Sequence, residues 1–151
     1  MNKFFFDDNE NGMDKEFSAQ VDKIISVNKD RMNALMREST QRVIDDAQTP
    51  TGKGGRMRVD TGFLRASGQL SLGGMPSGPV RGDPEKSYTF EGGTVSLTLA
   101  GAELGNSLFF GWSANYAQYR ETYDGFLSNA VSKWPKIVET VTEEIKRKIG
   151  L

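Results

Sequence analysis

This chain of 151 residues and 16.7 kDa is long enough to form one domain with a core of its own. Its 19 basic and 20 acidic residues leave a net charge of −1, which argues against a polycation that coats nucleic acid. The absence of Cys and His excludes disulfides, thiolate–metal sites, imidazole–metal centres and Ser-His-Asp triads. We therefore expect no enzyme, no cofactor and no metal site.

The apolar runs are short, and the longest, such as Phe4–Phe6, contain only three residues. A membrane-spanning helix needs about 20 apolar residues, so no membrane span is predicted. The apolar block near the start is also too short for a signal peptide. We expect a protein that remains in the compartment where it is made.

A long helix is predicted over residues 14–47, preceded by an arm over residues 1–13. Asp14 is placed to cap this helix, and Pro50 disfavours helix at the residue before it. Some 33 residues at 1.5 Å each make a rod of about 50 Å, which is long for a small domain. We expect the rod to extend beyond its own core. Its apolar stripe consists of Phe17, Val21, Ile24, Ile25, Met32, Leu35, Met36 and Val43.

The middle of the chain is rich in glycine: 14 of the 17 glycines lie between Gly52 and Gly111. Glycine destabilises helix interiors, so a sheet is predicted over about residues 69–113. The expected strands are a hairpin over 88–99 that turns at Gly92-Gly93, a strand over 108–112 and a weaker one over 69–72. The segment 73–87 holds four Gly and three Pro, and a loop of that length is typically functional or disordered.

Two helical segments are predicted after the sheet, over about residues 114–123 and 126–149. Pro135 either kinks the second segment or begins a new helix, and the pattern leaves both open. The fold class is therefore α+β in a single domain over residues 14–151. A long N-terminal helix, a central antiparallel sheet of about four strands and a C-terminal helix packed on that sheet are expected.

Two local patterns are candidates for contact with nucleic acid. A glycine-rich segment with a local excess of positive charge contains Lys53, Arg56 and Arg58. Such a segment can contact the phosphates of DNA or an acidic protein surface, and a merely solvated loop fits the pattern equally well. Tyr116, Tyr119 and Tyr123 are spaced as one helix face; we predict that they face the core, with base stacking as the alternative.

The candidate subunit interface is apolar. Phe4, Phe5 and Phe6 would be an aggregation hazard if exposed, so they are expected to pack on this domain or on a neighbouring copy. Met75 and Val80, in the 73–87 loop, are the other candidates for this interface.

Three segments of the chain carry distinctive motifs: Val59-Asp60-Thr61-Gly62-Phe63-Leu64-Arg65, Tyr116-Ala117-Gln118-Tyr119-Arg120-Glu121 and Phe126-Leu127-Ser128-Asn129-Ala130. Together they resemble motifs of the tail-completion (head–tail joining, neck) proteins of long-tailed bacteriophages. The first matches that family's Val-Asp-Thr-Gly-x-Leu-Arg-x-Ser segment, the second its Tyr-Ala-x-Tyr-x-Glu stretch and the third its Phe-Leu-x-x-Ala helix start. The loop between the second and third is shorter than is usual in the family. The matching residues are Val59, Asp60, Thr61, Gly62, Leu64 and Arg65, then Tyr116, Ala117, Tyr119 and Glu121, then Phe126, Leu127 and Ala130.

The first of these segments also has a reading from the residues alone. Asp60, Thr61 and Gly62 predict a turn, because Asp and Thr side chains bond nearby N–H groups and glycine tolerates positive φ. Leu64 is then expected in the core and Arg65 at the surface.

The resemblance implies a non-enzymatic structural subunit of the virion, assembled in the bacterial cytoplasm. It implies a ring of copies, sixfold in that family, at the head–tail junction or the upper end of the tail. The implied partners are neck, tail-tube or head-closure proteins and DNA passing through the ring. The long helix, the arm and the 73–87 loop are expected to supply the subunit contacts. The alternatives are a head-closure or tail-terminator ring subunit and, from another class, a small nucleic-acid-binding module.

Overall fold

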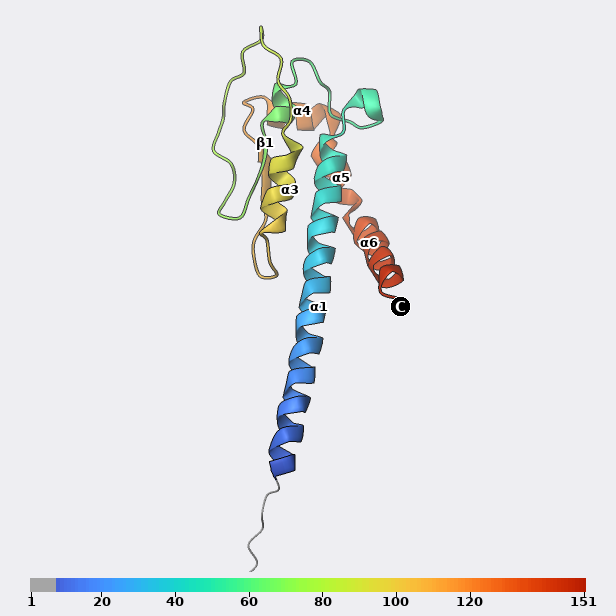
Figure 1. The fold of residues 1–151 in the computed structure, drawn as a ribbon. Helices are drawn as coiled ribbons and strands as arrows, with labels where there is room; N and C mark the ends of the chain where they lie inside the picture. The colour runs from blue at the N-terminus through green and yellow to red at the C-terminus, as the bar shows by residue number, and fades with distance from the viewer. Residues whose placement is uncertain (1–7) are drawn as a thin grey trace, which may run out of the picture.

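The computed structural model describes residues 8–151, with side chains from Gly12 onward. Its dominant feature is α1, Asp8–Gln48, which carries the remaining elements against its C-terminal part only (Figure 1). The predicted long helix is confirmed, but it begins at least six residues before Asp14, which lies inside it and does not cap it. Phe4, Phe5 and Phe6 lie outside the described residues.

The sheet has two antiparallel strands, β1 (Gly68–Ser71) and β2 (Phe109–Trp112). Gly68 pairs with Trp112 and Ser71 with Phe109, so the strands predicted near 69–72 and 108–112 are confirmed. The α+β class holds, but the expected four-stranded sheet is wrong for the described chain. Helices form most of the body.

The predicted hairpin over 88–99 is wrong, because Gly92–Ala100 forms the helix α3. Val95 and Leu99 are four residues apart and are buried together against Ile44 of α1, while Leu97 on the opposite face is 76% exposed. The Thr98 hydroxyl donates to the carbonyl of Thr94 at 2.9 Å, within the helix. Packing against α1 therefore outweighs the strand propensity of the β-branched residues.

The C-terminal region consists of three helices, α4 (Ala117–Asp124), α5 (Phe126–Ser132) and α6 (Trp134–Lys148). The second predicted segment is thus split, and Pro135 lies in the first turn of α6, where its missing N–H costs no helical hydrogen bond. Gly125, with φ of +63°, joins α4 to α5 in a conformation that favours glycine.

Side chains from distant segments form two buried clusters. One contains Ile44, Val95 and Leu99, between α1 and α3. The other joins Met57, Leu64, Ala114 and Phe126, where the loop after α1 meets the short helix α2 (Phe63–Ala66) and α5. Both clusters lie at the C-terminal end of α1, so the body of the molecule is built around that end alone.

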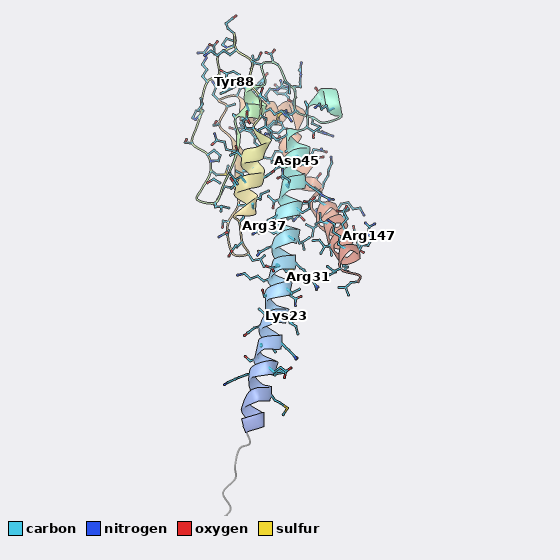
Figure 2. All side chains as sticks on the ribbon, in the orientation of Figure 1. Lys23, Arg31, Arg37, Asp45, Tyr88 and Arg147 are labelled. Atoms are coloured by element: carbon cyan, nitrogen blue, oxygen red, sulfur yellow. The ribbon has the colours of Figure 1, made fainter. Side chains whose placement is uncertain are left out.

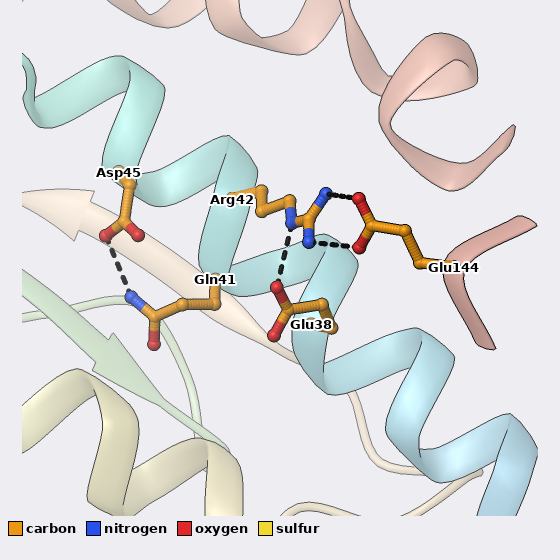
Figure 3. A network of polar contacts seen from close by, with 5 residues as sticks. All are labelled: Glu38, Gln41, Arg42, Asp45 and Glu144. Carbon is orange, nitrogen blue, oxygen red and sulfur yellow. Dashed lines mark hydrogen bonds and ion pairs between the residues drawn. The ribbon is translucent and has the colours of Figure 1, made fainter. Parts of the chain in front are cut away.

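A bidentate ion pair fixes α6 along α1. The Arg42 guanidinium donates to the two carboxylate oxygens of Glu144 at 2.5 and 3.2 Å, and to Glu38 at 2.8 Å (Figure 3). These hydrogen bonds raise the pKa of Arg42 and lower the pKa of Glu144 below its ordinary value. Lys133, just before α6, also pairs with Asp46 at 2.8 Å. These contacts place α6 on one defined face of α1.

The segment 73–87 crosses the body without helix or strand, apart from one bridge between Val80 and Ala114. The Val80 amide donates to the carbonyl of Ser113 at 2.6 Å, which holds the middle of the segment against the body. Among residues 8–151, no helix combines the length and apolar character that crossing a membrane requires.

Candidate functional site

The turn over Asp60, Thr61 and Gly62 forms as predicted. The Phe63 amide donates to the Thr61 hydroxyl at 3.3 Å, and Gly62 has φ of +85°. A Cβ on Gly62 would lie 2.3 Å from the carbonyl oxygen of Tyr88, and the Tyr88 amide donates to the carbonyl of Thr61 at 2.8 Å. Glycine is therefore needed both for the backbone conformation and for the close approach of the neighbouring chain.

Arg65 differs from the prediction, because it is half-buried and bonded to the end of α1. Its Nε donates to the carbonyl of Gln48 at 2.8 Å, and its guanidinium lies 5.5 Å from the ring centre of Phe90. The buried Gln48 side chain donates to the carbonyl of Arg65 at 2.9 Å and accepts from Trp112 Nε1 at 2.9 Å. Arg65 thus has a structural role. The sequence pattern gave no signal for Gln48 as its partner.

The three segments that carry the family resemblance meet in one region of the body. Leu64 of the first and Phe126 of the third are buried in the same cluster, and Ala117 of the second packs against it. Glu121 accepts from the backbone amides of Leu127 and Ser128 at 2.8 and 2.9 Å, so its carboxylate caps the N-terminus of α5. The segments therefore cooperate in folding this end of the molecule.

An open pocket of about 520 Å³ lies over the first two segments. Arg58, Asp60 and Arg120 line it together with the turn, and Arg120 forms an ion pair with Asp124. Tyr116 also lines the pocket; partial burial raises the pKa of its hydroxyl, and the negative charge of Asp60 adds to this. The pocket is a polar, mixed-charge surface.

Two of the arginines that line this pocket have partners in the fold, because Arg120 is paired with Asp124 and Arg65 is bonded to the end of α1. Within residues 8–151, no group of three acidic side chains is placed to bind a metal ion.

The tyrosines do not form the predicted core-facing stripe. Tyr116 precedes α4, while Tyr119 and Tyr123 are 60% and 69% exposed. The rings of Tyr119 and Tyr123 contact each other with centroids 4.8 Å apart. The helix α4 buries none of its residues fully, so Tyr119 and Tyr123 form an aromatic pair on the surface of the body.

The other candidate residues are exposed. Lys53, Arg56 and Arg58 lie on or after the single 3₁₀ turn Thr51–Lys53 that follows α1. Met75 and Val80 are 63% and 47% exposed on the 73–87 segment. Of these basic and apolar residues, only Arg58 lines the 520 Å³ pocket described above, so the structure does not gather them into one patch with it.

A second, apolar hollow of about 420 Å³ lies between α1, the sheet and α5, and we call it the α1–α5 groove. Phe110 and Trp112 form its floor from the sheet, and Leu127, Val131 and Trp134 are more than a third exposed at its rim. Leu127 is the only motif residue in this lining. Sequence reasoning did not identify Trp134 or Val131 as surface residues, because both fit the apolar stripe of the last helices.

A further exposed apolar surface lies on the N-terminal part of α1. Five side chains are 50–69% exposed there, which contrasts with the buried Ile44 and Ala47 further along the same helix. Figure 2 places Lys23 on this part of α1, below the body, and Arg31 about level with the C-terminal end of α6. The five residues are Met13, Phe17, Ile24, Ile25 and Met32.

Comparison of the chain with family models, with curated proteins and with solved structures gave no match.

Proposed function

We propose that this chain is a non-enzymatic structural subunit of a long-tailed phage particle, which forms a ring at the head–tail junction or the upper end of the tail. The observation that carries the proposal is the amount of exposed apolar surface in the described chain. It lies on the part of α1 that projects beyond the body (Figure 1), at the rim of the α1–α5 groove, and at Met75 and Val80 of the 73–87 segment. Monomeric proteins rarely expose apolar surface on this scale, and such surface is typical of assembly subunits.

The three resembling segments support the same proposal. Leu64, Ala117 and Phe126 meet in or against one core cluster, and Glu121 caps the helix that begins at Phe126. Segments that build one structural unit are expected to occur together in proteins that share a fold. Their joint presence is better explained by a common scaffold than by three unrelated matches.

A ring requires heterologous contacts, in which one patch of a subunit meets a different patch of the next. The α1–α5 groove and the exposed apolar residues of the 73–87 segment are two such patches on this chain. Neighbouring neck or tail-tube proteins are the further partners that the proposal implies. A head-closure or tail-terminator ring subunit would use the same surfaces at another position in the particle.

Gold-labelled antibodies against this chain test the proposal directly on phage particles from a producing host. We expect label at a single position where the tail meets the head or ends below it. Label distributed over the capsid or along the tail, or no label on intact particles, would contradict the proposal.

The nucleic-acid alternative is tested by DNA binding of the wild type as a function of salt. A protein that contacts phosphates through Lys53, Arg56 and Arg58 loses affinity steeply as salt rises. Replacement of Arg56 and Arg58 by Ser should then abolish that slope. We expect no salt-dependent affinity in either protein.

A further inference from the structure

The exposed stripe of α1 lies in line with the face that α6 covers. Val21, Asn28, Leu35 and Arg42 follow one another at seven-residue spacing, which keeps them on one side of the helix. Arg42 is bound by Glu144 of α6, and Leu35 is partly buried, whereas Asn28 is exposed. The face therefore loses its cover where α6 ends, and a further helix could continue along it.

We propose that this uncovered part of α1 pairs with the same part of a second copy, with the two helices antiparallel and the twofold axis between Asp22 and Lys23. The proposal goes beyond the ring and does not rest on it. An isologous pair of this kind closes on itself, so ring contacts would fall to the α1–α5 groove and the 73–87 segment.

The charges along the stripe favour the antiparallel direction. The first half, residues 14–22, carries Asp14, Lys15, Glu16 and Asp22 and has a net charge of −2. The second half, residues 23–31, carries three basic residues and one acidic residue, for a net charge of +2. Antiparallel pairing places each half beside its opposite, whereas parallel pairing places like beside like. The antiparallel helix dipoles favour the same arrangement.

The side chains match at the same centre. With the axis between residues 22 and 23, Val21 lies level with Ile24 of the second copy, and Met13 with Met32. Charged residues at the two ends of the stripe also match. Asp14 lies seven residues before Val21 and becomes level with Arg31 of the second copy, and the same pair forms at the other end. The polar Asn28 lies level with Phe17, and a polar residue in such a seam selects one register at some cost in stability.

The size of the stripe suits a dimer of moderate affinity. Each of the five most exposed side chains can contribute on the order of 100 Å² of apolar surface. Two copies would then bury roughly 1,000 Å² from these residues alone, near the lower limit for specific interfaces. The overlap over residues 13–32 measures about 29 Å. Within it Lys29 pairs with Glu103 of the body at 3.9 Å, and directly after it Asn33 accepts from the Leu104 amide at 2.8 Å.

Sedimentation of the full chain tests the proposal through a charge exchange. We expect the wild type to dimerise with a Kd below about 200 µM. Asp14→Arg or Arg31→Asp should each raise this Kd about tenfold. The double variant D14R/R31D should return to within about threefold of the wild type, since each new Arg again faces an Asp. Asp22→Arg is the matched control: it makes the same change in the net charge of the first half, but about 100° around the helix from Val21. An effect below about threefold would separate the direct pairing of Asp14 with Arg31 from the general charge of the two halves.

A second variant tests the apolar contact. Ile24→Asp should weaken dimerisation at least about 100-fold because it places a carboxylate in the seam. Ile24 is 61% exposed in the single chain, so the circular dichroism and thermal unfolding of the monomer should not change. A wild type that remains monomeric at 200 µM, a dimer that tolerates Ile24→Asp, or a double charge variant weaker than both single variants would overturn the proposal.

Discussion

The two ends of α1 have the same backbone structure and opposite surroundings. Residues 35–48 carry the buried side chains Ser39, Ile44, Ala47 and Gln48, whereas residues 13–32 expose their apolar side chains. The stability of the folded body thus depends on one end of the helix, while the other end leaves its apolar side chains exposed. Equivalent substitutions at the two ends should therefore change different measured quantities.

The largest contrast is expected between two phenylalanines. Phe126→Ala creates a cavity in a closed core and should lower the free energy of unfolding by about 3–5 kcal/mol in urea titrations. Phe17→Ala should change the unfolding of the monomer by less than about 0.5 kcal/mol, because its ring is 69% exposed, but should weaken self-association. A comparable loss of monomer stability in both variants would show that the buried body and the exposed end of α1 do not differ as described.

A smaller contrast is expected between two glutamines. Gln48→Ala leaves the carbonyl of Arg65 and the Nε1 of Trp112 without their partner, which should cost about 2–4 kcal/mol. Gln20→Ala removes an exposed side chain and should change the unfolding free energy by less than about 0.5 kcal/mol. Chemical denaturation of both variants measures the difference; equal effects would contradict the structural role given to Gln48.

Two glycines should respond with opposite signs. Gly62→Ala forces a side chain into positive φ and against the carbonyl of Tyr88, and should destabilise the protein by about 1–3 kcal/mol. At Gly12, inside α1, an added Cβ has no atom within 4 Å, so Gly12→Ala should stabilise the helix there by up to about 1 kcal/mol and raise its helix content. Thermal unfolding and far-ultraviolet circular dichroism report on the two changes. Stabilisation by Gly62→Ala would exclude the turn described here.

The smallest effect is a pH dependence at the α1–α6 contact. Because the pKa of Glu144 is lower in the folded state, its ion pair with Arg42 stabilises the protein above the ordinary carboxyl pKa. This contribution disappears as pH falls through the lowered folded-state value. The urea midpoint of Glu144→Gln should therefore be below that of the wild type at pH 7, and the two should converge under acidic conditions. A difference that persists or grows at low pH would contradict this assignment.

The sequence predicted the elements whose signals are local. The two strands, the turn at Asp60–Gly62 and the helices at both ends follow from alternation, glycine placement and apolar periodicity. The helix α3 could not be predicted in this way, because Val95 and Leu99 fit a strand as well as a helix and only their contact with Ile44 decides. The role of Arg65 likewise depends on Gln48, a contact across 17 positions that no local pattern indicates.

The exposure of the aromatic side chains near the C-terminus could not be predicted from the sequence, for a related reason. Tyr119, Tyr123 and Trp134 all lie on apolar helical spacing, which indicates one face of a helix but not what that face contacts. In this molecule the helices at that end are short and pack through Phe126, Ala130 and Val141, so the larger aromatic rings remain partly or largely exposed. Periodicity predicted helices correctly there and burial incorrectly.

The central claim is that the exposed end of α1 is covered by a second copy that runs in the opposite direction. The chain has no Cys, so single cysteines can be introduced at Val21 and at Ile24 in separate proteins and the two mixed under oxidised glutathione. We expect a covalent dimer that joins Val21→Cys to Ile24→Cys in preference to either self-linked species. Self-linked dimers in preference to the mixed one, or no covalent dimer at all, would contradict the account.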